Sequence, residues 1–222
     1  MANSNKGDKG LRAIVIGMII FVLAVTGFFI YLDKKPAENA QAPASISKAD
    51  GSGLVFNPTL KNQIDIWEDF QCPYCKFFET AMGDYLETLV REKQAKVVYH
   101  MASFLGQESV RASNAANCAV EEGRFIEFHQ ALYDVQASEN SGIFSNKNLV
   151  EIGKRLGITS PSFESCVNDN KFGDTVKKVG ESMAKNNVQG TPTVFINGKL
   201  WNRSGSDFVL DEFKAAVEAA KQ

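Results

Sequence analysis

The sequence predicts an α/β fold, in which a mixed central sheet is flanked by helices, carries an inserted all-helical subdomain and follows one N-terminal transmembrane helix. Three observations support this prediction. A strand pattern at residues 64–70 is followed by a helix and a second strand. The segment from about 108 to 187 has only helical patterns, and a strand, a turn and a final helix come after it.

The first part of the chain indicates a membrane anchor. Residues 13–32 form a run of 20 residues without a charge, bracketed by Arg12 and Asp33. A helix of that length spans a hydrocarbon core of roughly 30 Å. A cleaved signal peptide is the alternative, but its apolar part is usually only about 7–15 residues long. We therefore expect a cytoplasmic tail at 1–12 and a transmembrane anchor at 13–32, although the basic residues on its two sides are too evenly divided to fix its orientation.

Residues 33–53 are rich in Ala, Pro, Ser and Gly and show no apolar periodicity, so we expect a flexible linker. The folded domain is then residues 54–222. The net charge is −2 and 44% of the residues are hydrophobic, which is ordinary for a globular protein. Nothing in this charge suggests a surface for nucleic acid.

The domain begins with a strand at 64–70, a helix over about 73–93 and a strand at 96–101. Apolar residues recur at helical spacing in the helix, and the unit is of the strand–helix–strand type. The insertion follows, about 108–187. Its predicted helices are at 108–123, 124–136 and 145–157, then one starting at Ser160 and Pro161, and one around 172–183.

The end of the chain returns to strand patterns. Residues 193–196 are β-branched and aromatic, and Asn197-Gly198 is the strongest short signal for a hairpin turn. Residues 199–201 form the returning strand. A final helix is expected over about 207–221.

The motif CPYC, residues 72–75, carries the chemistry. Pro73 suits the first position of a helix, which makes Cys72 the N-cap residue, beside unpaired N–H groups and the positive end of the helix dipole. Such cysteines have pKa values of about 3.5–7.5, against about 8.5 for a free thiol. Cys75 comes at the third helical position and is expected to turn inward. An exposed thiolate with a buried partner suits thiol–disulfide exchange.

Other uses of a CxxC pair fit less well. Structural zinc needs four ligands, and beyond this pair the chain offers only Cys118, Cys166, His100 and His129. Two thiolates can hold Cu(I), but no methionine or histidine cluster accompanies them. A structural disulfide within four residues would constrain little. We therefore expect redox chemistry without an organic cofactor or a metal.

Three segments carry a family resemblance, namely EDFQCPYCKFFE, ASNAANCAVEEGRFIEFHQALY and VQGTPTVFING. They resemble the DsbA-like thiol–disulfide oxidoreductases of the thioredoxin superfamily, above all the membrane-tethered Gram-positive type and its actinobacterial forms. The resemblance runs from about residue 54 to the C-terminus and implies a thioredoxin fold. It also assigns Thr191-Pro192 to a loop with a cis-proline that faces the active site, where the Thr191 backbone would pair with an extended substrate.

The chain departs from this family at two positions. Tyr74 stands where well-known DsbA proteins have histidine, and it cannot offer a positive charge to the thiolate, so we expect a less oxidising disulfide. Many thioredoxin relatives carry a buried acid six residues before the nucleophile, where this chain has Ile66. Glu68 is closer, and it could accept or relay the proton of Cys75 or lie at a solvated strand end.

Cys118 and Cys166 lie 48 positions apart in predicted helices. In an exported protein with an even number of cysteines, a structural disulfide is the better interpretation, and two buried thiols are the alternative. His129 is expected on a helix surface or in packing.

Together these features predict a single-pass membrane protein with an extracytoplasmic catalytic domain. It would introduce disulfides into unfolded exported proteins that have free cysteines. The resemblance implies reoxidation by a quinone-linked membrane partner of the DsbB or vitamin-K-epoxide-reductase (VKOR) type. The alternatives are a disulfide reductase or isomerase and, from a different class, a membrane-anchored module that binds copper or polypeptides without turnover.

Overall fold

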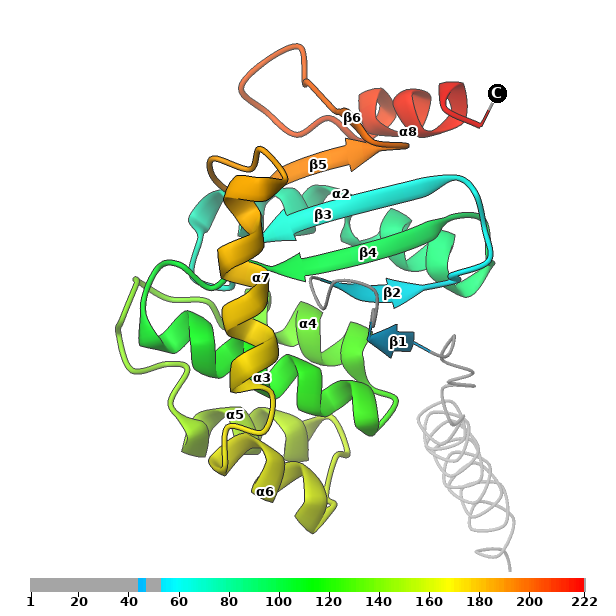
Figure 1. Ribbon diagram of the computed structural model, residues 1–222. Coiled ribbons are helices and arrows are strands. Elements are labelled where there is room, and N and C mark those ends of the chain that lie inside the picture. Colours follow the sequence, from blue (N-terminus) through cyan, green and yellow to red (C-terminus); the bar gives the residue numbers. More distant parts are fainter. Residues whose placement is uncertain (1–43, 47–52, 222) are drawn as a thin grey trace, which may run out of the picture. The chain divides into compact units, whose positions relative to one another are not determined.

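A computed structural model describes residues 44–46 and 53–221 of the chain (Figure 1). The predicted tail at 1–12, the anchor at 13–32 and most of the linker at 33–53 lie outside these residues. No helix in the part of the chain that is described has the length and apolar character needed to span a membrane.

The described residues contain one mixed sheet, as predicted, with the strand order β1-β2-β4-β3-β5-β6. β3 and β4 are parallel, and each other neighbouring pair is antiparallel. The strands are β1 (Ala44–Ile46), β2 (Leu54–Phe56), β3 (Gln63–Glu68), β4 (Lys96–Met101), β5 (Thr193–Ile196) and β6 (Lys199–Leu200).

β1 corrects the linker prediction, because residues 44–46 pair with β2 although they lie within the predicted linker 33–53. Their side chains gave no strand pattern. The edge of β2 offers backbone N–H and C=O groups that any extended segment can satisfy, so the pairing does not depend on a sequence signal.

The parallel strands β3 and β4 are joined by α2 (Pro73–Arg91), which places the CxxC motif directly after a strand. Pro73 is at the first helical position, as predicted. The apolar stripe of α2 is fully buried and fixes the helix on the sheet; its members include Phe78, Met82 and Leu86. On the same layer, α2 contacts α4 and α8.

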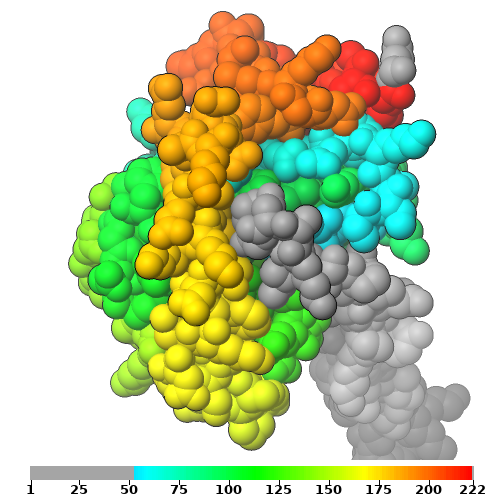
Figure 2. Space-filling model, in the orientation of Figure 1, coloured from blue at the N-terminus to red at the C-terminus, as the bar shows by residue number. Residues whose placement is uncertain are grey.

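The predicted helical insertion is present between β4 and β5. Its helices are α3 (Gln107–Glu121), α4 (Phe125–Asp134), α5 (Asn146–Arg155), α6 (Pro161–Asn168) and α7 (Gly173–Lys185). Ser160 caps α6 by accepting a hydrogen bond from the backbone N–H of Phe163 at 3.2 Å. α7 lies across the face of the sheet opposite α2 (Figures 1 and 2). It contacts β4, and its Val179 belongs to a small apolar cluster with Trp67.

The chain ends with the predicted hairpin and helix. Asn197 and Gly198 have φ angles of 49° and 77°, the pair of positive values that a tight hairpin turn requires. α8 (Leu210–Ala219) begins three residues later than predicted. The reason is that Glu212 accepts hydrogen bonds from the backbone N–H and hydroxyl of Ser204, which holds the preceding loop in a non-helical path.

Candidate active site

The two cysteines of the CxxC motif occupy different environments at the start of α2. Cys72 is the N-cap residue, with φ −73° and ψ 118°, and Cys75 is at the third helical position. Both are free thiols. Cys75 is fully buried, as predicted, whereas Cys72 is only 7% exposed, so the prediction of an open thiolate is wrong in degree. The loop of Thr191 covers it, with the Thr191 carbonyl oxygen 3.3 Å from the Cys72 sulfur.

The surroundings of Cys72 favour its thiolate. A hydrogen bond from the Cys75 thiol is the main cause, with further contributions from the Thr191 hydroxyl and the backbone N–H groups of Tyr74 and Cys75; together they outweigh burial and lower the pKa of Cys72 to about 6. The Thr191 hydroxyl is buried and has no hydrogen-bond partner within the described part of the chain. It is therefore available to donate to the thiolate.

The surroundings of Cys75 favour its protonated thiol, unlike those of Cys72. Burial is the largest cause that raises its pKa well above the usual range, and the hydrogen bond to Cys72 and the negative charges of Cys72 and Glu68 raise it further. Near neutral pH the pair is therefore a thiolate at Cys72 and a thiol at Cys75. This is the division of roles that thiol–disulfide exchange uses.

The Thr191–Pro192 peptide bond is cis, in agreement with the family resemblance. Beside it lies a groove of about 540 Å³, which begins at Tyr74 and runs along Thr193 to the loop after β6, where Arg203 and Phe208 line it. Tyr74 lines the groove, and Phe77 lies beside it, with the two ring centroids 6.2 Å apart in an edge-to-face arrangement; the two residues are 60% and 61% exposed. Two exposed aromatic side chains such as Tyr74 and Phe77 can contact an apolar side chain near a substrate cysteine.

The turn before Cys72 is held by Asp69. This fully buried carboxylate accepts hydrogen bonds from the backbone N–H groups of Gln71, Phe104 and Leu105 and from the Ser109 hydroxyl, at 2.6–3.0 Å. These bonds join the end of β3 to the loop after β4.

Gln136 supports the same turn from the loop after α4. Its side-chain amide donates to the carbonyl oxygens of Phe70 and Cys72, at 2.7 and 3.0 Å. Sequence reasoning missed Gln136, because it is the last residue of the predicted helix 124–136 and lies 64 positions from Cys72.

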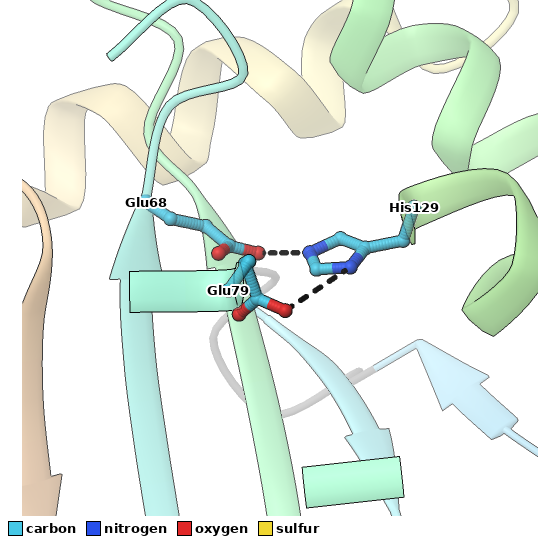
Figure 3. Close-up of side chains that lie close together, drawn as sticks. All are labelled: Glu68, Glu79 and His129. Carbon is cyan, nitrogen blue, oxygen red and sulfur yellow. Dashed lines mark hydrogen bonds and ion pairs between the residues drawn. The ribbon is translucent and has the colours of Figure 1, made fainter. Parts of the chain in front are cut away.

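Glu68 of β3, Glu79 of α2 and His129 of α4 form a buried cluster (Figure 3). Glu68 is fully buried and hydrogen-bonded to Nε2 of His129, and Nδ1 of His129 is 3.8 Å from Glu79. One of the two alternatives left open for each residue is thereby excluded: Glu68 is not at a solvated strand end, and His129 is not on a helix surface but packs in the interior. The three side chains place one oxygen or nitrogen atom each within 4.8 Å of one another.

Glu79 and His129 were not predicted as site residues, although the sequence holds a signal for both. Glu79 follows the core residue Phe78 and lies one turn after Cys75, so it falls within the buried face of α2. His129 falls within the buried face of α4, next to Phe128. An ionisable residue inside an apolar stripe is the signal that points to a buried cluster.

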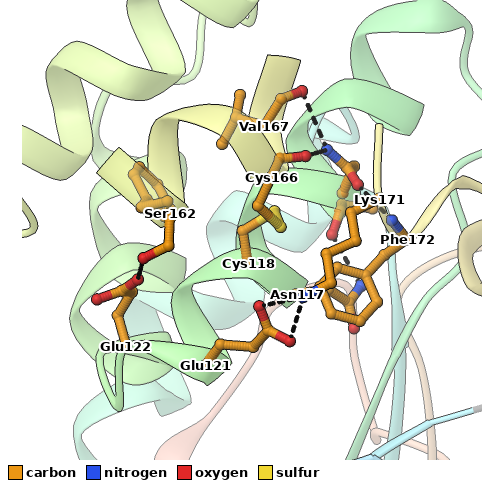
Figure 4. Close-up of a disulfide and its surroundings, with 12 residues drawn as sticks. Asn117, Cys118, Glu121, Glu122, Ser162, Cys166, Val167, Lys171 and Phe172 are labelled. Atoms are coloured by element: carbon orange, nitrogen blue, oxygen red, sulfur yellow. Dashed lines mark hydrogen bonds and ion pairs between the residues drawn. A yellow bond between two sulfur atoms is a disulfide. The ribbon is translucent and has the colours of Figure 1, made fainter. Parts of the chain in front are cut away.

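The second cysteine pair, Cys118 and Cys166, forms a disulfide between α3 and α6 (Figure 4). Near it, the Asn114 side chain donates to the carbonyl oxygens of Cys166 and Val167 at 3.3 Å. The bond ties the helical insertion together and touches none of the residues around Cys72.

Comparisons with known proteins agree with this geometry. The family described as "Thioredoxin" matches residues 53–219. A disulfide bond oxidoreductase (DsbG) from Mycobacterium tuberculosis, in its reduced form, is 30% identical over 72% of this chain and 78% of its own, with a TM-score of 0.62. Oxidised DsbA from the same organism is also 30% identical, over 72% of this chain and 83% of its own, with a TM-score of 0.61.

Curated relatives are more distant. "Probable disulfide bond formation protein D" of Bacillus anthracis is 25% identical, over 98% of each chain. A Rickettsia typhi relative named as a protein-disulfide oxidoreductase is 25% identical over 78% of this chain, which spans 63% of the relative's length. The family match, the two M. tuberculosis structures and the paired cysteines at the N-terminus of α2 lead to one conclusion: the chain belongs to the DsbA-like thiol–disulfide oxidoreductases of the thioredoxin superfamily.

Proposed function

We propose that the protein is an extracytoplasmic disulfide oxidase, which gives the Cys72–Cys75 disulfide to exported, unfolded proteins with free cysteines. One observation carries this proposal: the pKa of Cys72 is lowered to about 6 while the pKa of the buried Cys75 is raised. A thiolate that is stable at neutral pH is a good leaving group, and its stability favours the reduced form of the enzyme. The disulfide is therefore readily given away.

The reaction proceeds by two exchanges at sulfur. A substrate thiolate attacks Cys72, the Cys72–Cys75 bond breaks, and Cys75 leaves with the electron pair and takes up a proton. A second substrate thiolate then attacks the substrate sulfur of the mixed disulfide and releases Cys72 as its thiolate. Pro73 and Tyr74 tune the pair through the start of the helix, Glu68 exchanges the proton of Cys75, and no organic cofactor or metal takes part.

The substrate is an extended chain beside the cis-proline loop. The backbone of Thr191, next to Pro192, lies against the Cys72 sulfur, where main-chain pairing can hold a substrate cysteine in line. Such recognition reads the backbone more than the side chains, which suits an enzyme that acts on many unfolded proteins.

Turnover requires that Cys72 and Cys75 return to the disulfide. We propose a quinone-linked membrane partner of the DsbB or VKOR type, which the relatives named for disulfide bond formation support in general terms. The apolar run at 13–32 is proposed as the single membrane anchor and 33–43 as its tether. The anchor would keep the catalytic domain close to this partner and to emerging substrates.

A measured reduction potential separates an oxidase from a reductase or isomerase. The argument for the second alternative is Tyr74, which offers no positive charge to the Cys72 thiolate. Soluble protein that begins after Lys35 is equilibrated in graded glutathione buffers. Reference potentials are about −270 mV for thioredoxin, about −200 to −230 mV for glutaredoxins and about −120 mV for DsbA. We expect a value above roughly −180 mV, and a value near or below −230 mV would assign the protein to the reductases.

A trapping experiment separates an enzyme from a binding module. In Cys75→Ser, Cys72 has no partner to resolve mixed disulfides, so adducts with exported proteins should accumulate and be released by a reductant. Cys72→Ser is the matched control and should form none. A copper carrier would instead bind stoichiometric Cu(I) in the wild type and give no adducts in Cys75→Ser.

A further inference from the structure

The cluster of Glu68, Glu79 and His129 leaves several buried polar atoms without a partner. Among the described residues, one carboxylate oxygen each of Glu68 and Glu79 and the hydroxyl of Tyr133 have no hydrogen bond. A buried polar group left unpaired costs roughly 1–3 kcal/mol. Packing alone would not select three such atoms in one place, which points to a function.

The cluster reaches from the buried cysteine to the surface. On the inner side, Cys75 and Glu79 are both buried and lie one turn apart on α2, and the negative charge of Glu68 helps to raise the pKa of Cys75. On the outer side, Glu79 lines a surface groove of about 280 Å³, with Asp84, Gln130, Tyr133 and Asp134. Glu79 is 8% exposed and Glu68 is not exposed at all, so Glu79 is the member that meets water.

The charges of the cluster allow it to hold one exchangeable proton. Burial, followed by the negative charge of Glu68, raises the pKa of Glu79 to about 8. Burial alone would lower the pKa of His129, but the charges of Glu68 and Glu79 raise it. Near neutral pH, Glu79 is therefore mostly protonated, next to the hydrogen-bonded pair of Glu68 and His129.

We propose that Glu79 exchanges the proton of Cys75 with water in the groove, and that the proton moves between Cys75 and Glu79 by way of Glu68 and His129. This inference rests on the proposed exchange reaction. The inference adds to that reaction a route by which the buried Cys75 thiol can gain and lose a proton while α2 stays packed on the sheet.

The proton balance follows the two directions of the reaction. When a substrate thiolate breaks the Cys72–Cys75 bond, the Cys75 sulfur takes one proton from the cluster, and water in the groove returns one to Glu79. During reoxidation the Cys72 thiolate attacks a partner disulfide, the partner's S–S bond breaks, and one partner sulfur leaves as a thiolate. Cys75 then gives its proton to the cluster and attacks the Cys72 sulfur of the mixed disulfide. The second partner sulfur leaves as a thiolate, and Glu79 releases a proton to water in the groove.

The rate of this last step should depend on pH through Glu79. The titratable groups that face Glu79 are Glu68 on β3, Tyr99 on β4, and His129 and Tyr133 on α4, and Asp84 and Asp134 line the groove outside it. When Glu79 has lost its proton, the cluster accepts a proton from Cys75 more readily. The resolution rate should therefore rise through an inflection near pH 8.

The test follows the adduct between Cys72 and glutathione. The reduced full-length chain in detergent is mixed with oxidised glutathione between pH 5.5 and 9.5, quenched with acid and analysed by mass spectrometry. In Glu79→Gln the adduct should decay at least tenfold more slowly at pH 8, and the inflection should disappear. Glu92→Gln is the matched control, because it removes a carboxylate at the exposed C-cap position of α2, outside the groove, and it should keep the wild-type profile.

A rescue experiment distinguishes proton transfer from a structural role. Glu79→Ala removes the carboxylate and leaves space in the groove for a small carboxylate from solution. Added formate or acetate should therefore restore the decay rate of the adduct in proportion to the concentration of the added ion. The inference is overturned if Glu79→Gln stays within twofold of the wild type and keeps the inflection, or if it is slow with an unchanged profile and no rescue. If the wild type itself forms no Cys72–Cys75 disulfide, the proposed function fails, and this inference fails with it.

Discussion

At the scale of single residues, the reactivity of Cys72 comes from neighbours that are distant in sequence. Its sulfur lies at a helix N-terminus, which the motif itself specifies, but Thr191 is 119 positions away and covers it. The N-cap position was predictable because Pro73 marks the start of the helix. The contact with Thr191 was expected only from the family resemblance, since no local pattern brings the two segments together.

We predict that Cys72 reacts with iodoacetamide with a midpoint near pH 6, because the thiolate is the nucleophile. Thr191→Val should raise the midpoint by about one unit, since a hydrogen bond to a charged group contributes roughly 1.5 kcal/mol. The measurement is the pH dependence of the alkylation rate. Thr80→Val is the control, because the Thr80 hydroxyl bonds only within α2, to Lys76. A midpoint near 8.5 in the wild type would contradict the prediction.

Asp69→Asn should destabilise the protein by about 2–5 kcal/mol. Each of the two carboxylate oxygens of Asp69 accepts two hydrogen bonds, and in asparagine an NH₂ group, which cannot accept them, takes the place of one oxygen. Whichever way the amide turns, two donors lose their acceptor. Urea unfolding of the reduced protein measures the loss. Asp84→Asn makes the same change at an exposed position of α2 and should stay within about 0.5 kcal/mol. Equal stabilities of the two variants would show that Asp69 does not hold the turn.

At the scale of elements, the sequence was most informative where side-chain pattern and local geometry agree. β4 matches its predicted range, and α6 begins at the predicted serine cap because a proline and a serine define that start locally. β1 had no such signal, since only backbone pairing with β2 forms it. The buried cluster of Glu68, Glu79 and His129 was missed for a related reason: β3, α2 and α4 each contribute one member, and the partners lie as far as 61 positions apart.

The disulfide between α3 and α6 should stabilise the insertion without affecting the chemistry at Cys72. Removing it with Cys118→Ala/Cys166→Ala opens a loop of 48 residues and should lower the free energy of unfolding by about 4 kcal/mol at most. Urea unfolding under non-reducing conditions measures the loss. Cys72→Ser/Cys75→Ser is the control, since it removes the other pair. The alkylation rate of Cys72 should stay unchanged in the first variant, and a large change would contradict the separation of the two pairs.

At the scale of the whole molecule, the redox state of one motif should determine part of the folding free energy. In the reduced protein the pKa of Cys72 is about 6, whereas a cysteine in the unfolded chain has a pKa of about 8.5. A group whose pKa is lowered by folding stabilises the folded state fully above its unfolded pKa, and this stabilisation is lost as the pH falls through the folded value. The oxidised protein has no thiol at Cys72 and lacks this contribution.

We therefore predict that the reduced form gains stability over the oxidised form as the pH rises from 6 to 8, by about 2 kcal/mol. Above about pH 8.5 the gain should level off and then reverse, because the raised pKa of Cys75 acts in the opposite direction. Thermal unfolding of both forms at pH 5, 6, 7 and 8 gives the difference directly, since groups that titrate alike in both forms cancel. Cys72→Ser lacks the thiolate, so its stability should not show this rise relative to the oxidised wild type. If the difference in stability between the two forms stayed constant across this range, the fold would not stabilise the Cys72 thiolate. Transfer of the disulfide to a substrate would then not be favoured by the stability of the reduced enzyme.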